Sequence, residues 1–260
     1  MRALLFDIDG VLFQQGRAIA GAADTICWAR QQQIPFRLLT NTTSKSRARI
    51  CADLSTSGIP VTEEQILSPP VAAREWLQEQ HIRRAELLVP EGIRAEFAGF
   101  CDAGEPQAVV LGDMGYEFRF ERLNQAFRLL MHNPQLPLVA LGMTRYFAAA
   151  DGLQLDVGPF VKALEYATGR TAVVMGKPAA AFFQQALHDM GVDAAQALMI
   201  GDDRIGDVLG AQACGIAGAL VRTGKYRPGD EDADAQGLKP DYVLTSVAGL
   251  PALWEQLNAG

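Results

Sequence analysis

The sequence predicts an α/β fold: a doubly wound parallel sheet with a smaller α/β domain inserted into it. Short apolar runs alternate with helical patterns along the 260 residues, which is typical of parallel strands joined by crossover helices. The runs are rich in Ala, Val, Ile and Leu, as expected of strands that are buried on both faces. Residues able to do chemistry flank the middle of the chain on both sides, and this arrangement favours an insertion.

The first section of the chain begins with an apolar strand over residues 3–6. A helix is expected over 22–33, a second buried strand over 36–39 and a second helix over 44–57. Gly58 stands directly after the second helix, where a glycine commonly ends a helix. Strand and helix therefore alternate from the first residues onward.

The later sections repeat the alternation. Expected strands of the last section are 173–175, 198–200, 216–221 and 242–244, with helices over 179–190, 205–214 and 248–257. The middle section has strand candidates at 87–89, 109–111 and 138–141 and helix candidates near 94–99 and 121–132. We therefore expect a core formed by residues 1–74 and 173–260, and an inserted domain over 75–172.

Composition excludes some classes of function. The formal net charge of −7 argues against a nucleic-acid partner, which would require a basic face. No run of about 18 apolar residues occurs, so we expect no membrane span. Asp7 and Asp9 interrupt the apolar start of the chain, which is too short for the hydrophobic region of a signal peptide. We expect a cytoplasmic protein.

Polar residues follow four of the expected strands, where each strand ends. They are Asp7 and Asp9, then Thr40 and Asn41, then Lys177, and finally Asp202, Asp203 and Asp207. In an open parallel sheet, ligands bind where the strands deliver their carboxyl ends into loops. We therefore expect these side chains to gather along one edge of one sheet.

The chemistry of this set is that of a metal-assisted phosphoryl transfer. Carboxylates suit Mg²⁺, which takes one or two of them together with phosphate oxygens. A carboxylate can also attack phosphorus and form an aspartyl-phosphate. A lysine and a hydroxyl can neutralise the oxygens of the transferring group. Asp7 and Asp9 project to the same side of an extended backbone, and Gly10 permits a sharp turn after them.

Each motif alone has an ordinary structural interpretation. Asp7 to Gly10 could be a turn, Thr40 a helix cap, and Gly201 to Asp203 a turn before a helix. The combination of four such motifs at four strand ends is more specific than any one of them.

The four motifs, in this order, resemble those of the haloacid dehalogenase-like phosphatase superfamily. The resemblance spans essentially the whole chain, and the insertion lies where that superfamily carries its C2-type cap domain. Three longer segments, 158–167, 199–208 and 221–225, are similar to segments of one subgroup with such caps.

This resemblance implies roles for the matching residues. Asp7 is implied to be the nucleophile and a Mg²⁺ ligand, and Asp9 the general acid and base whose backbone carbonyl also binds the metal. Asp202 is implied to complete the metal site, and Lys177 to steady the nucleophile and the phosphoryl charge. The subgroup also includes relatives with a non-acidic residue at the position that matches Asp9. The presence of Asp9 here favours hydrolysis of ordinary phosphoesters as well as of activated bonds.

The remaining residues have binding or supporting roles by the same resemblance. Thr40 and Asn41 are implied to bind phosphate, Asp207 to orient its loop, and Asp203 to reach a metal-bound water. Arg145 lies in a segment similar to cap segments that face the active site, where it could pair with a phosphate or carboxylate. A solvated Arg145 is an equal alternative.

The sequence thus predicts an enzyme that hydrolyses a small phosphate monoester, phosphoamide or pyrophosphate with Mg²⁺ through an aspartyl-phosphate. One alternative is a 2-haloacid dehalogenase, which uses a nucleophile like Asp7 but needs neither Asp9 nor a metal. Another is a non-catalytic phospho-acceptor or scaffold protein. Relatives often dimerise through the cap, so the resemblance also allows a homodimer.

Overall fold

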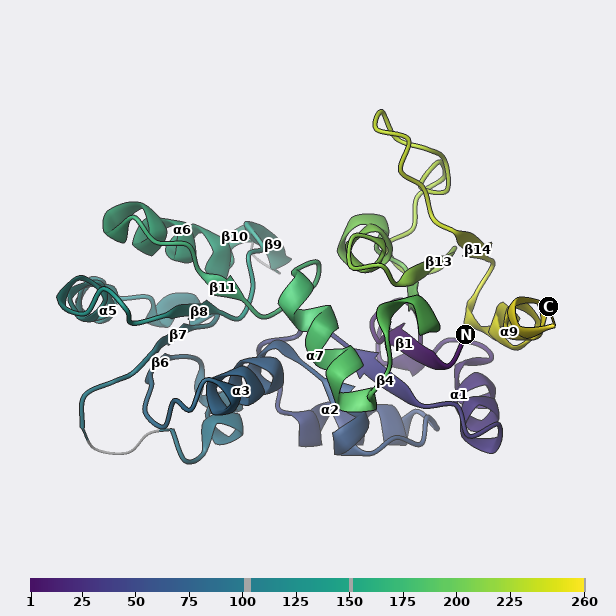
Figure 1. Ribbon diagram of the computed structural model, residues 1–260, viewed down its shortest axis with the longest axis horizontal. Coiled ribbons are helices and arrows are strands. Elements are labelled where there is room, and N and C mark those ends of the chain that lie inside the picture. The colour runs from purple at the N-terminus through teal and green to yellow at the C-terminus, as the bar shows by residue number, and fades with distance from the viewer. Residues whose placement is uncertain (101–103, 150–151, 260) are drawn as a thin grey trace. The chain divides into compact units, whose positions relative to one another are not determined.

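The computed structural model describes residues 1–100, 104–149 and 152–259, and its described part divides into two compact units (Figure 1). The first, here the core unit, comprises Met1–Thr40, Arg47–Leu67 and Lys177–Gly260. The second, the inserted unit, comprises Asn41–Ser46 and Ser68–Gly176. Among the described residues, no helix is both long enough and apolar enough to cross a membrane.

A six-stranded sheet organises the core unit, and all of its strand pairs are parallel. Its order is β14-β13-β12-β1-β4-β5. The strands are β1 (Ala3–Asp7), β4 (Phe36–Leu39), β5 (Ile66–Leu67), β12 (Ala197–Gly201), β13 (Ala217–Val221) and β14 (Tyr242–Leu244). The chain runs outward from β1 in one direction through β4 and β5, and returns to the other side of β1 through β12. Such a reversal of strand order beside β1 is where ligands bind in doubly wound sheets.

Helices of the core unit connect these strands. They are α1 (Ala22–Gln31), α2 (Arg47–Thr56), α7 (Ala180–Met190), α8 (Gly210–Gln212) and α9 (Leu250–Asn258), with short 3₁₀ turns η1 (Glu63–Gln65), η4 (Ala194–Gln196) and η6 (Val247–Gly249). A π-helical turn, η5 (Arg204–Leu209), precedes α8, and a small antiparallel hairpin, β2 (Phe13–Gln14) and β3 (Arg17–Ala18), follows β1. The N-terminal amine donates a hydrogen bond to Asn258 Oδ1 at 2.8 Å, so the two ends of the described chain meet (Figure 1).

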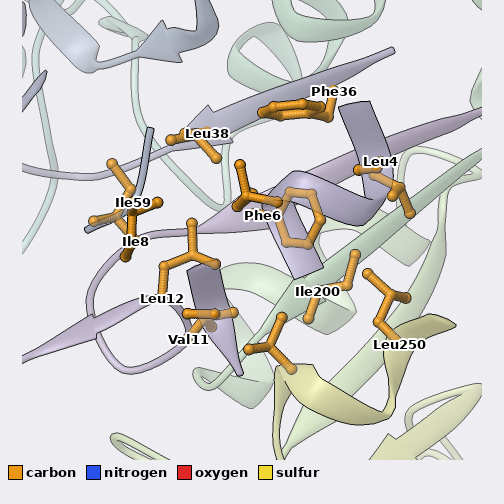
Figure 2. Close-up of a cluster of buried hydrophobic side chains, with 14 of the residues drawn as sticks. Leu4, Phe6, Ile8, Val11, Leu12, Phe36, Leu38, Ile59, Ile200 and Leu250 are labelled. Carbon is orange, nitrogen blue, oxygen red and sulfur yellow. The ribbon is translucent and has the colours of Figure 1, made fainter. Parts of the chain in front are cut away.

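Apolar side chains bury the sheet on both faces. One face carries Leu4, Phe6, Leu38 and Ile200, which pack with residues of α1, α2 and α9 (Figure 2). The rings of Phe6 and Phe36 meet edge to face, with centroids 6.0 Å apart. Successive strand residues point to opposite faces, and the alternate residues of β1 and β12 are buried as well. The sheet is therefore covered on both sides, as a doubly wound fold requires.

The inserted unit has a parallel sheet of its own, in the order β11-β8-β7-β6. Its strands are β6 (Glu86–Leu88), β7 (Val109–Leu111), β8 (Leu138–Ala140) and β11 (Val173–Val174), and an antiparallel hairpin is formed by β9 (Tyr146–Ala149) and β10 (Gly152–Leu155). Its helices are α3 (Pro69–Glu79), α4 (Glu91–Arg94), α5 (Phe120–His132) and α6 (Val157–Thr168), with 3₁₀ turns η2 (Ala95–Phe97) and η3 (Gly115–Glu117). The inward faces of α5 and α6 pack on its strands through one apolar cluster.

The predicted fold class is confirmed, but one strand was assigned to the wrong sheet. Val173 and Val174 pair with β8 in the inserted unit, and not with a strand of the core sheet. The sequence suggested that Lys177 follows a strand of the core sheet. It follows a strand of the inserted unit instead. Choice of strand partner is a long-range property that the apolar run itself does not encode. The helix predicted over 205–214 is also different, because it begins as the π-helical turn η5.

Candidate active site

Two neighbouring strands deliver acidic residues to one edge of the core sheet. β1 ends at Asp7, and β12 ends at Gly201, directly before Asp202. The two strands pair in parallel along four residues, so their carboxyl ends lie side by side. Both strands are apolar and fully buried, and this fixes where their terminal carboxylates emerge.

A third carboxylate, that of Asp207, joins them. One oxygen from each of Asp7, Asp202 and Asp207 lies within 4.8 Å of the others, and all three residues are buried. Asp207 belongs to η5 and packs against the end of β12, since a Cβ built on Gly201 would lie 2.2 Å from its Cβ. A side chain at position 201 would exclude Asp207 from the cluster.

Lys177 forms the positive centre of this cluster. Its Nζ forms an ion pair with Asp207 Oδ1 at 2.7 Å and another with Asp7 Oδ1. It also donates to the carbonyl oxygen of Leu39 at 3.5 Å. The lysine side chain is only 3% exposed. It comes from the segment that leads into α7. Three carboxylates and one ammonium group leave two negative charges uncompensated.

The pKa values of the cluster reflect this excess of negative charge. Burial, followed by the charge of Asp207, raises the pKa of Asp7 well above its usual range, although Lys177 acts against this rise. Burial also raises the pKa of Asp202 to about 6, opposed by the hydrogen bond from the Lys225 amide. Burial alone would lower the pKa of Lys177, but Asp207 and Asp7 raise it well above the ordinary lysine value.

The cluster fits a divalent cation. Asp202 Oδ1 is buried and accepts no hydrogen bond from any residue that the structure describes. A buried, unpartnered carboxylate oxygen is costly, and a hard cation with oxygen ligands would satisfy it. The two uncompensated negative charges match the charge of such an ion. The donor set and the charge thus both suit Mg²⁺.

Asp203 organises the backbone beside the metal candidates. Its side chain accepts hydrogen bonds from the amides of Ile205 and Gly206, at 3.1 and 2.8 Å, and so caps η5. Burial acts to raise its pKa, but the Gly206 amide and the charge of Lys225 lower it below the usual value. The Asp203 amide in turn donates to Asp207 Oδ2 at 3.2 Å. Asp203 and Asp207 therefore hold each other in place.

The other predicted site residues have varied positions. Thr40 is buried directly after β4, and its amide donates to the carbonyl of Leu67 at 3.2 Å. Asp9 is exposed and lies outside the acidic cluster formed by described residues. Asn41 falls in the inserted unit, where its Oδ1 lies beside Gly176. Arg145, in the same unit, is exposed, and its guanidinium carbon lies 5.8 Å from the ring centroid of Tyr146.

Sequence reasoning gave no role to the residues that follow β13. The Thr223 hydroxyl donates to the carbonyl oxygen of Gly10, and the Lys225 amide donates to Asp202 Oδ2. The segment 221–225 was notable only for its similarity to relatives. The one sequence feature that could have indicated a role in the site is the Thr-Gly pair at the end of a predicted core strand.

Comparison with known proteins decides the family. A family model described as a haloacid dehalogenase-like hydrolase matches residues 4–100, and a related HAD-hydrolase model matches residues 174–250. Phospholysine phosphohistidine inorganic pyrophosphate phosphatase of Homo sapiens is 43% identical over 235 residues, covering 89% of this chain and 86% of that protein. The chain belongs to the haloacid dehalogenase-like hydrolases. The family resemblance inferred from the sequence is thereby confirmed.

Other members of these hydrolases are similar over nearly the whole chain. Haloacid dehalogenase-like hydrolase domain-containing protein 2 of Bos taurus is 40% identical over 232 residues, covering 89% of this chain and 88% of that protein. The solved structure of p-nitrophenyl phosphatase from Archaeoglobus fulgidus has a TM-score of 0.86 at 27% identity, covering 97% of this chain and 98% of that one. NagD from E. coli K-12, with a TM-score of 0.83 at 22% identity and coverage of 95% and 97%, shares the fold.

We predict that Asp202→Asn stabilises the protein in the presence of a chelator and abolishes its stabilisation by Mg²⁺. The amide keeps an acceptor for the Lys225 N–H but removes a buried negative charge. Because the folded-state pKa of Asp202 is raised to about 6, this charge destabilises the wild type above pH 6. The penalty disappears below the unfolded value of about 4.

Melting temperatures with chelator at a series of pH values test this expectation. The variant should melt above the wild type at pH 8, and the difference should shrink as the pH falls through 6 toward 4. A variant that melts below the wild type at every pH, or that Mg²⁺ still stabilises fully, would contradict the assignment of Asp202.

Proposed function

We propose that this protein is a Mg²⁺-dependent phosphatase that hydrolyses a small phosphorylated substrate through an aspartyl-phosphate on Asp7. A phosphate monoester, a phosphoamide or pyrophosphate would serve as substrate. The observation that carries the proposal is the buried cluster in which Lys177 pairs with Asp7 and Asp207 beside Asp202. Relatives named as phosphatases of phospholysine, phosphohistidine, pyrophosphate and p-nitrophenyl phosphate agree with this chemistry.

In the first step, an oxygen of the Asp7 carboxylate attacks phosphorus. A carboxylate–phosphorus bond forms as the bond from phosphorus to the leaving oxygen or nitrogen breaks. Asp9, two residues along, donates a proton to the leaving atom. Lys177 orients Asp7 and favours its ionised form, and the Lys177 ammonium group is itself held in place by Asp207.

In the second step, water attacks the phosphorus of the aspartyl-phosphate and releases inorganic phosphate. Asp9, now a carboxylate, takes the proton from that water, which restores both aspartates. Asp7, Asp202 and the backbone carbonyl of Asp9 would hold Mg²⁺, which when bound supplies positive charge to the phosphoryl oxygens and to the buried carboxylates. Asp203 and Asp207 support the loop from which Asp202 projects.

Thr40 and Lys177 would contact the phosphoryl oxygens from the core unit, and Asn41 would add an amide. We further propose that the segment 75–172 acts as a cap that selects the leaving group, with Arg145 as its anion-binding side chain. A guanidinium suits a carboxylate or a second phosphate on the substrate.

Asp7→Asn tests the proposal directly, because it removes the nucleophilic charge while keeping the shape of the side chain. The wild type should hydrolyse p-nitrophenyl phosphate only with Mg²⁺, and the variant should lose at least about 10³-fold in turnover. Pyrophosphate, phosphohistidine and phosphorylated metabolites complete the substrate panel. Near-wild-type turnover by the variant, or metal-independent release of halide from a 2-haloacid by the wild type, would refute the proposal.

Asp9→Asn tests the general-acid assignment. The loss of turnover should be larger for alkyl phosphates than for aryl phosphates or phosphoamides, because an alkoxide leaving group depends more on protonation. Turnover rates of the variant and the wild type on one member of each class measure the effect. An equal loss on all three classes would count against a proton donor at position 9.

A further inference from the structure

The segment Thr223-Gly224-Lys225, here the strap, touches two loops of the candidate site but takes no part in the mechanism above. It follows β13, and the sheet order places β12 between β13 and β1. The strap contacts the loop after β12 and also the loop after β1. It therefore crosses two strand spacings, roughly 10 Å, over the edge where the acidic residues emerge.

Three hydrogen bonds attach the strap to these loops. The Thr223 hydroxyl donates to the carbonyl oxygen of Gly10, three residues beyond Asp7. The Lys225 amide donates to Asp202 Oδ2 at 2.6 Å. The Lys225 ammonium group donates to Asp203 Oδ2 at 3.2 Å. One short segment thus connects the nucleophile loop with two acidic residues of the next loop.

Two glycines form a slot for the Asp202 carboxylate. Gly10 and Gly224 have φ angles of +91° and +61°, which strain any other L-residue. A Cβ built on either glycine would lie 1.9 Å from Asp202 Oδ2. It would also lie within 3 Å of the Cα of the other glycine. The carboxylate therefore fits between the two loops only because both positions lack side chains.

This slot leaves the two oxygens of Asp202 with different roles. Oδ2 is held between the glycines by the Lys225 amide, whereas Oδ1 is buried and has no hydrogen-bond partner among the described residues. Groups that hold a metal-binding side chain in one orientation commonly change metal affinity by about 10- to 100-fold when they are removed.

We propose that the strap is a positioning segment that presents Asp202 Oδ1 to the divalent cation and fixes Asp202 relative to the loop of Asp7 and Asp9. The inference rests on the proposed function for the identity of the cation. It adds that cation affinity depends on a segment outside the residues assigned to hold the cation. Thr223 is the residue whose side chain bonds the strap to the loop of Asp7 and Asp9.

Thr223→Val tests the inference, because valine keeps the shape of threonine and lacks the hydroxyl. Isothermal titration of the full-length variant with MgCl₂, without substrate, should give a dissociation constant about tenfold above that of the wild type. In turnover assays, more Mg²⁺ should be needed for half-maximal activation. Saturating Mg²⁺ should restore most of the kcat, and the KM for p-nitrophenyl phosphate should stay unchanged. Thr223→Ser retains the hydroxyl and should restore Mg²⁺ affinity.

Thr25→Val is the matched control within the core unit. The Thr25 hydroxyl also donates to a distant backbone carbonyl, that of Val247, at 3.3 Å. Losing this bond should lower the melting temperature without changing Mg²⁺ affinity. A stability effect alone would therefore appear in both variants, whereas a positioning effect would appear only at Thr223.

The possible results separate the two proposals. Wild-type Mg²⁺ affinity in Thr223→Val, or an equal loss of affinity in Thr25→Val, would overturn the role of the strap. If Thr223→Val does not fold, Thr223→Ala is measured by the same criteria. A failure of the proposed function would look different, because the wild type itself would then neither bind Mg²⁺ nor need it for turnover.

Discussion

Lys177 is buried between Asp7 and Asp207, and the other features of the candidate site depend on this pair of contacts. Taking three charged groups out of water is expensive, and only well-placed partners offset the cost. The core fold supplies the placement from three distant segments of the chain. β1 delivers Asp7, the turn after β12 delivers Asp207, and the segment before α7 delivers Lys177. A displacement of any one of them would leave a buried charge without its partner.

The negative charge of the cluster is nevertheless not neutralised by its own residues. Three carboxylates share one ammonium group, the pKa values of Asp7 and Asp202 are raised, and Asp202 Oδ1 lacks a partner among the described residues. Electrostatic strain of this kind is common at functional sites, where stability is given up for binding. The uncompensated negative charge of the buried cluster is therefore the strongest physical argument for a bound cation. The strap adds to this imbalance, because its Lys225 amide bonds to Asp202 Oδ2 and the buried Oδ1 is left without a hydrogen bond from any described residue.

Much of this arrangement was predictable from the sequence. The strands 36–39, 109–111 and 242–244 agree with β4, β7 and β14 to the residue, because short apolar runs bounded by polar residues are a local signal. The approach of Asp7 to Asp202 also follows, since the parallel strands β1 and β12 deliver their ends to one edge. Lys177 was expected in the same cluster and is found there, although the strand before it belongs to the other sheet.

The features that the sequence did not predict depend on contacts between distant segments. The run 173–175 is apolar in either sheet, so its pairing with β8 could not be read from its residues. Asp207 was expected beside the other strand-end residues, but its ion pair with Lys177 was not predicted. The strap was unassigned because its contacts reach Gly10 and Asp202, more than 20 residues away in the sequence.

In the proposed mechanism, Asp7 becomes covalently phosphorylated during turnover. Acid quenching of the wild type during turnover of a phosphorylated substrate with Mg²⁺, followed by peptide mass spectrometry, tests it most directly. We expect one added phosphoryl group on the peptide that contains Asp7, and none when Mg²⁺ is chelated. A phosphoryl group on another residue would contradict the account. So would an unmodified Asp7 in an enzyme whose kinetics show a burst of product release.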